Sequence, residues 1–218
     1  MRYLNKIVFI NSAAIRYSEV QLDGNIHLIG TQGVGKSTIL RAILFFYNAD
    51  TQRLGIPVEK KSYQDYYFPY ADSSIIYEVA REDGWFTVLS YKTMNRICYR
   101  FIASPYRSDL FIDEEGAPYP SDRIRSVLDK NGIKYSGAIS TYEEYRNILY
   151  GNSDNKRDYS CFSLMESGSY QNIIRTIQNV LLNSRLEADY IKQTIITSLN
   201  EADSVIDLSR YRSHLSGF

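Results

Sequence analysis

A short glycine-rich stretch holds the residues whose types and spacing could do chemistry. Residues 30–37 (GTQGVGKS) fit the pattern of Gly, four residues, Gly, Lys and then Ser or Thr, which is typical of phosphate-binding loops. Its three glycines allow successive main-chain N–H groups to turn inward around a phosphate chain. Lys36 would bring an ammonium to the β- and γ-phosphates, and the Ser37 hydroxyl would be one of several oxygen ligands of a magnesium ion. The pattern therefore predicts a site for ATP with Mg²⁺.

The sequence on either side of the loop favours the same interpretation. Residues 25–29 (NIHLI) predict a short buried strand that ends at Gly30. Residues 37–47 (STILRAILFFY) carry apolar side chains at helical spacing. A strand, a glycine loop and a helix in this order aim the N-terminus of the helix at an anion. The alternative, a chance match in an ordinary loop, is disfavoured by the complete pattern and by both flanks.

The composition is ordinary for a soluble globular protein, with 44% apolar and 23% charged residues. Lys and Arg number 25 and so do Asp and Glu, so no overall basic charge indicates nucleic acid, although a neutral protein can carry a local basic face. The apolar runs are too short to span a membrane, and the N-terminus is not that of a signal peptide. Cys98 and Cys161 lack metal-ligand spacing and are expected to be reduced, in or near the core of a cytoplasmic protein.

The first half of the chain predicts mostly strands. Two strands, at residues 3–10 and 13–22, precede the loop, and a meander of antiparallel strands follows it at residues 73–80, 85–91 and 96–102. Between them, residues 48–70 show no clear period and are expected to form a long surface loop. Arg53 in that loop is the nearest arginine that could reach nucleotide phosphates, although a solvated loop arginine is favoured.

The second half of the chain predicts mostly helices. Ser121 or Asp122 can cap the first, and Thr141 begins the second with capping-box spacing. The last residues have the pattern of a further helix just beginning, so the chain is interpreted as ending inside an element. The predicted elements are helices at residues 123–130, 141–151, 167–183 and 186–199, a return strand at 159–165, and the start of a helix at 205–215.

Two stretches resemble other ATPase motifs but fit them poorly. Residues 110–114 (LFIDE) resemble a Walker B strand, but their apolar run is short and turn residues follow at once. A surface β-hairpin is favoured there, and Glu114 is not predicted to be catalytic. Residues 215–217 (LSG) match the start of an ABC signature, which Phe218 breaks. No catalytic residue is predicted, so the groups that complete catalysis are expected to lie elsewhere.

In the order of its elements, the chain resembles the N-terminal lobe of an ABC-type ATPase head of the SMC class, which includes SMC, MukB, DNA-repair relatives and the Wadjet defence ATPase. The resemblance rests on two strands, the Walker A residues 30–37, the helix after them, an antiparallel layer, a return strand and further helices. It implies an α/β P-loop fold with an antiparallel β layer and C-terminal helices that lead toward a coiled coil. In that class the signature, Walker B and switch histidine belong to a separate C-terminal lobe.

The resemblance also implies which residues bind. Ser37 would bind magnesium, and so would Gln171, because the class places a glutamine after the return strand. Gln171 lies six residues beyond that strand, so a helix-surface glutamine is an equal alternative. Asn11, Ser12 and Arg16 lie near the early strands, where the class contacts nucleotide and sometimes DNA, and are weaker candidates. The predicted nucleotide-binding residues are Gly30, Gln32, Gly33, Val34, Gly35, Lys36, Ser37 and Thr38.

Together these patterns predict one ATP-binding head lobe over residues 1–218. Its parts are a β layer with the phosphate loop at 1–50, the antiparallel meander at 73–120, and the return strand with helices at 159–218. The expected partners are the C-terminal lobe of the same ATPase, a second head in a head-to-head homodimer, and DNA. Hydrolysis is expected only when the C-terminal lobe and head dimerisation complete the site, and the chain alone is expected to be weak or inactive. The alternatives are a self-contained small nucleotide or metabolite kinase, and an interaction module that binds nucleotide as a structural ligand.

Overall fold

The computed structural model describes residues 2–24, 26–48, 62–94, 96–151 and 159–164, all within one of the two units into which the chain divides. The predictions for Arg53, Gln171, residues 215–218 and the helices beyond residue 166 lie outside these residues.

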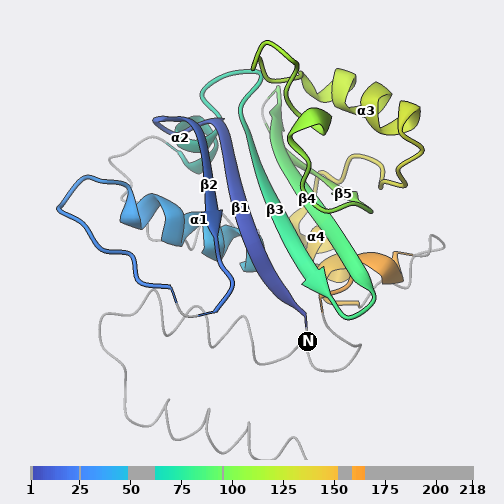
Figure 1. Ribbon diagram of the computed structural model, residues 1–218, viewed down its shortest axis with the longest axis horizontal. Helices are drawn as coiled ribbons and strands as arrows, with labels where there is room; N and C mark the ends of the chain where they lie inside the picture. Colours follow the sequence, from blue (N-terminus) through green and yellow to red (C-terminus); the bar gives the residue numbers. More distant parts are fainter. Residues whose placement is uncertain (1, 25, 49–61, 95, 152–158, 165–218) are drawn as a thin grey trace, which may run out of the picture. The chain divides into compact units, whose positions relative to one another are not determined.

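A five-stranded antiparallel sheet organises the described residues (Figure 1). The N-terminal hairpin and the later meander join because β1 pairs with β3, with Ile7 opposite Tyr77. Both sets of strands were expected from the sequence, but their joining into one sheet was not. The strand order is β2-β1-β3-β4-β5, with β1 at Tyr3–Ser12, β2 at Ile15–Gln21, β3 at Ser74–Arg81, β4 at Gly84–Thr93 and β5 at Arg96–Ile102.

Successive side chains of a strand point to opposite faces, and here both faces are covered. One face packs on α1, Lys36–Asn48, and α4, Tyr142–Leu149. On that side the Tyr77 hydroxyl of β3 donates to the carbonyl of Ala42 in α1, at 3.1 Å. The other face packs on α3, Ser121–Lys130, where Ile124 and Leu128 join Val8 and Ile76 in a buried apolar cluster. The sheet is therefore the middle layer between two cores.

The segment expected to be a long surface loop contains a short helix, so that part of the prediction is wrong. The helix α2 spans Tyr63–Tyr67, and the Ser62 side chain accepts a hydrogen bond from the main-chain N–H of Asp65. Tyr63 and Tyr67 are four residues apart, so they share one side of the helix and are both buried. Tyr63 stacks on Phe45 of α1, with ring centroids 4.4 Å apart. Aromatic packing on α1 thus fixes a segment whose sequence shows no long period.

Two predicted strands are absent from the described residues. Residues 26–30 carry no strand pairing, and the Ile29 side chain is 90% exposed. Of the predicted return strand, residues 159–164 contain a 3₁₀ turn at Ser160–Phe162 instead. Phe162 is buried against Phe101, with centroids 5.6 Å apart. A strand requires a neighbour that pairs along its length, and among the described residues the main chain of residues 159–164 makes only a single such contact with another element, from the Leu164 N–H to the Leu149 carbonyl at 2.7 Å.

Other local predictions have mixed outcomes. Thr141 caps α4 as expected, accepting from the N–H of Glu144. For α3 the prediction of Ser121 or Asp122 as the cap is wrong, because the helix begins after Pro120 and has no side-chain cap hydrogen bond. Cys98 is buried, whereas Cys161 is exposed rather than near the core. Within the described ranges, no helix is both long enough and apolar enough to cross a membrane.

Candidate phosphate-binding site

The glycine loop leads directly into the N-terminus of α1, as the sequence pattern predicts. Gly33 has a φ of +89°, a conformation that side chains with a Cβ rarely adopt. At Gly30 the restriction is steric, since an added Cβ would lie 2.7 Å from Cγ2 of Val34. The N–H of Ile39 donates to the Gly35 carbonyl at 3.1 Å, so helical hydrogen bonding begins inside the loop. Gly35 has a similar φ of +94°, so each of the three glycines has a structural reason.

Lys36 folds back across the loop that precedes it. Its Nζ donates to the carbonyls of Gly30 and Thr31, at 2.6 Å each. An ammonium has three hydrogens, so one remains for another acceptor while these two contacts hold the loop closed. The charge of Lys36 thus lies over the carbonyls of the loop.

The N-terminus of α1 is suited to an anion. The N–H groups that precede Ile39 have no carbonyl one turn earlier within the helix to bind, and this terminus carries the positive end of the helix dipole. The first turn, residues 36–39, is described in full and contains no acidic side chain that would neutralise this charge. Lys36 adds a positive charge at the same position. The electrostatics of this turn therefore favour a phosphate group.

The two hydroxyl residues after Lys36 differ in their surroundings. Ser37 is exposed, whereas the Thr38 side chain is only 8% exposed. The Thr38 hydroxyl lies 3.0 Å from the hydroxyl of Tyr66, and the Thr38 carbonyl accepts a 2.7 Å hydrogen bond from the hydroxyl of Tyr67. Burial raises the pKa of Tyr67, so this hydroxyl stays protonated and can donate. Helix α2 is thus attached to the first turn of α1 by two adjacent tyrosines.

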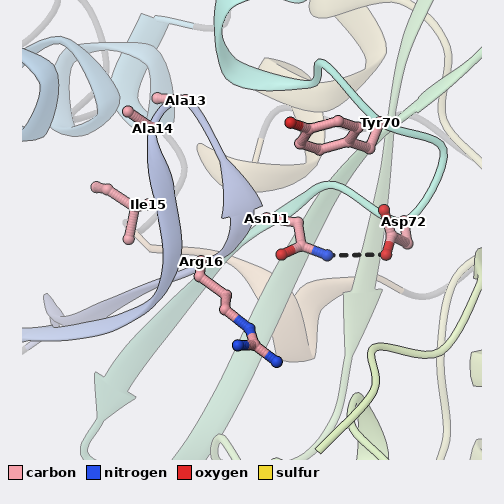
Figure 2. Close-up of a pocket in the computed structure, with 7 residues that line it drawn as sticks. All are labelled: Asn11, Ala13, Ala14, Ile15, Arg16, Tyr70 and Asp72. Carbon is pink, nitrogen blue, oxygen red and sulfur yellow. Dashed lines mark hydrogen bonds between the residues drawn. The ribbon is translucent and has the colours of Figure 1, made fainter.

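The same helix reaches the turn between β1 and β2, where a pocket of about 460 Å³ opens (Figure 2). The N–H of Ala13 donates to the Tyr67 carbonyl at 3.4 Å. Within the pocket, Nδ2 of Asn11 donates to the Asp72 carboxylate at 2.8 Å. Asn11 and Arg16 line the pocket, whereas Ser12 is buried and does not. The lining residues are Asn11, Ala13, Ala14, Ile15, Arg16, Tyr70 and Asp72.

Sequence reasoning missed the contribution of residues 62–72. Tyr66, Tyr67, Tyr70 and Asp72 lie in or directly after the segment interpreted as a surface loop. Two signals were present: Ser62 stands three residues before Asp65, and tyrosines recur four residues apart. Both are typical of a short capped helix with one buried side. The sequence could have predicted α2, but not the group against which it packs.

Metal ligands are sparse among the residues that the structure describes. There, no group of three or more His, Cys, Asp or Glu side chains could hold an ion. Ser37, exposed at the start of α1, is the one predicted magnesium ligand within the described ranges. The Asp113 carboxylate accepts from the N–H groups of Glu115 and Ala117, so it stabilises a turn. Glu114 is exposed beside it, and the Ile112–Pro118 bridge agrees with the hairpin prediction.

Comparison with known proteins places the chain in a family. A model of the family described as "Protein of unknown function (DUF3584)" matches residues 12–214, which is nearly the whole chain. The chain belongs to this family. Neither the curated proteins nor the solved structures gave a match. Because the family description names no activity, a proposed function has to rest on the residues of the site.

Proposed function

We propose that this chain is the ATP-binding N-terminal head lobe of an SMC-like ATPase that acts on DNA. The observation that carries the proposal is the glycine loop, with Lys36 over its carbonyls and an α-helix N-terminus behind it. The main-chain N–H groups at the start of α1, the ammonium of Lys36 and the absence of acidic residues from the first turn of α1 suit a triphosphate. Magnesium, when bound with Ser37 as one ligand, would offset the charge of the phosphates.

The proposed fold class is an α/β P-loop head of ABC/SMC type with an antiparallel β layer. The support is that α1, which follows the loop directly, packs on one face of a five-stranded antiparallel sheet. A second support is the exposed segment before the loop, where Ile26 and Ile29 face solvent and residues 26–30 form no ladder. In the proposed assembly, a strand of the C-terminal lobe pairs with this segment and covers its aliphatic side chains.

In this mechanism the chain binds and orients ATP but needs partners for turnover. Lys36 and the loop N–H groups hold the phosphates, and Ser37 contributes to the metal. The C-terminal lobe supplies the acidic groups and the signature, and a second head encloses the nucleotide in a head-to-head homodimer. Hydrolysis releases the heads, which allows the assembly to hold or move DNA. The proposed compartment is the cytoplasm, where the free thiols of Cys98 and Cys161 would stay reduced.

The test is nucleotide binding by calorimetry with magnesium, with turnover measured in parallel. Lys36→Ala should weaken ATP binding about tenfold or more, because it removes the only ammonium predicted to contact the phosphates. Lys134→Ala, an exposed lysine on the segment after α3, is the matched control and should bind as wild type. Thermal unfolding without nucleotide checks that both variants fold. Absence of ATP binding by the wild-type chain would overturn the proposal.

Turnover separates the proposed head lobe from its rivals. The chain alone should hydrolyse ATP very slowly, and a separately expressed C-terminal lobe should restore turnover that depends on Lys36. Brisk phosphoryl transfer by the chain alone would instead identify a self-contained kinase. Binding that never leads to turnover, even with the C-terminal lobe, would identify a module that uses nucleotide as a structural ligand.

A further inference from the structure

Two adjacent tyrosines of α2 contact the same residue of the phosphate loop in different ways. The Tyr67 hydroxyl binds the main-chain carbonyl of Thr38, and the ring of Tyr67 is fully buried. The Tyr66 hydroxyl lies 3.0 Å from the side-chain hydroxyl of Thr38, and Tyr66 is 38% exposed. Tyr67 thus anchors the main chain, whereas Tyr66 reaches a side chain predicted to bind nucleotide.

The position of Tyr66 is fixed by its neighbours. Its ring packs edge-on against Tyr67, with an interplanar angle of 82° and centroids 4.9 Å apart. The N-terminus of α2 is held by the Ser62–Asp65 hydrogen bonds, and Lys92 of β4 forms a 2.9 Å ion pair with Asp65. A side chain held in this way loses little further freedom when a ligand binds, so its hydroxyl is pre-organised.

In the hydrogen bond between the Tyr66 and Thr38 hydroxyls, Tyr66 is expected to be the donor. The oxygens of a phosphate chain at neutral pH mainly accept hydrogen bonds, so Thr38 must use its single hydroxyl hydrogen to bind one. A phenol is a stronger acid than an aliphatic alcohol and is the better donor, so Tyr66 can donate to Oγ1 of Thr38. Donation into Oγ1 polarises the Thr38 hydroxyl and strengthens the hydrogen bond that it gives.

We propose that Tyr66 is a positioning residue for phosphate recognition, acting through Thr38. Its hydroxyl donates to Oγ1 of Thr38 and leaves the Thr38 hydrogen directed at a phosphate oxygen of the nucleotide. The proposal rests on the proposed nucleotide-binding function. It adds a residue of α2, well separated in sequence from the glycine loop, to the residues on which phosphate affinity depends.

The test is a double-mutant cycle in the full chain, with magnesium and ATP as the probe. Tyr66→Phe keeps the ring and removes the hydroxyl, and Thr38→Val keeps the volume and removes the hydroxyl. Each single variant should weaken ATP binding by about three- to tenfold, the range expected for one hydrogen bond. The double variant should bind no more weakly than Thr38→Val alone, because Tyr66 acts only through that hydroxyl. In a Thr38→Ser background, Tyr66→Phe should again weaken binding.

The controls separate positioning from a general effect on the fold. Tyr142→Phe removes the hydroxyl of an exposed tyrosine at the start of α4 and should leave ATP affinity unchanged. Each variant is also unfolded without nucleotide, and a merely structural Tyr66 would lower stability equally in every background. Additive losses in the cycle, or no loss in Tyr66→Phe, would overturn the proposal while leaving nucleotide binding intact. If the wild-type chain bound no ATP, the proposed function would fail as well.

Discussion

The hydroxyl of Tyr67 donates a 2.7 Å hydrogen bond to the main-chain carbonyl of Thr38, and so joins α2 to the first turn of α1. The main-chain N–H of Ala13 also reaches Tyr67, at its carbonyl. A single tyrosine thus lies between the glycine loop and the turn that borders the pocket. The position of the loop therefore depends on a helix that follows it by about thirty residues in sequence.

Replacing Tyr67 tests this attachment. Tyr67→Phe should lower the free energy of unfolding by about 0.5–1.5 kcal/mol, because it removes one buried hydrogen bond and keeps the ring. The measurement is urea unfolding followed by fluorescence. Tyr142→Phe, in which an exposed hydroxyl is lost, should change the free energy by less than about 0.5 kcal/mol. Equal stability of both variants would show that the hydrogen bond contributes nothing net.

Two glycines with similar positive φ angles allow an effect on ATP binding to be distinguished from an effect on the stability of the fold. Gly33 has a φ of +89° and Gly116 a φ of +82°, and an added Cβ would meet no heavy atom within 4 Å at either position. Alanine at each should cost about 1–2 kcal/mol of backbone strain. Only Gly33→Ala should also weaken ATP binding, by about tenfold, because relief of the strain would turn loop N–H groups away from the phosphates.

Calorimetry and thermal unfolding of these two variants form one matched experiment. The expected pattern is similar destabilisation with a large difference in ATP affinity. Similar affinity in both variants would mean that the orientation of the main chain at Gly33 is not needed for binding.

An ion pair between β1 and β2 should make stability depend on pH. Nζ of Lys6 lies 2.7 Å from Oε2 of Glu19, and the Tyr17 hydroxyl donates to the same carboxylate. Burial acts to raise the pKa of Glu19, but the hydrogen bonds from Lys6 and Tyr17 outweigh it and lower the pKa below 4.5. The hydrogen bond to Glu19 raises the pKa of Lys6 above 10.5, although burial opposes this.

The directions of the pKa shifts of Glu19 and Lys6 define the pH range over which the ion pair stabilises the fold. The lowered pKa of Glu19 contributes stability above pH 4.5, which is lost as pH falls through the folded-state pKa. The raised pKa of Lys6 contributes stability below pH 10.5, which is lost as pH rises through its folded-state pKa. Glu19→Gln should therefore cost about 0.5–1 kcal/mol near neutral pH, and the difference from wild type should vanish in strong acid. Urea unfolding at a series of pH values measures this.

A mutation in the core on the face of the sheet opposite α1 should lower stability without changing ATP affinity. Leu128 of α3 is fully buried among Val8, Ile76 and Leu89, on the face opposite α1. Leu128→Ala should cost about 2–5 kcal/mol through lost burial and the cavity that it leaves. ATP affinity of the folded fraction, measured well below the unfolding midpoint, should match wild type. A parallel loss of affinity would show that the core under α3 also shapes the loop.

The exposed segment before the loop offers a test of the proposed C-terminal lobe. Ile29→Ser should change the stability of the chain alone by less than about 0.5 kcal/mol, since this side chain is already in solvent. It should lower the ATPase activity recovered on mixing with that lobe, because the proposed interface loses an apolar contact. Met94→Ser, at the exposed turn between β4 and β5, is the control. Equal recovered activity in both variants would place the lobe elsewhere.

The sequence by itself determined the features that depend on near neighbours in the chain. The glycine loop at residues 30–37, the helix after it and the Thr141 cap follow from spacing within a few residues. Runs of apolar, β-branched and aromatic residues bounded by turn residues likewise located the five strands to within a few residues. These predictions did not require knowledge of what each element packs against.

Only the tertiary structure decided the features that depend on a distant partner. Residues 26–30 and 159–164 have apolar content suited to strands, but a strand forms only where another main chain accepts its hydrogen bonds. Conversely, the spacing of Ser62, Asp65 and the tyrosines could have indicated α2, but only the tertiary structure shows that Tyr63 stacks on Phe45 of α1 and that Tyr67 binds the Thr38 carbonyl. The contacts of Tyr66 and Tyr67 with Thr38 likewise depend on a partner that is distant in the sequence. Their energy comes from burial and hydrogen bonding across long sequence separations, which local sequence patterns do not contain.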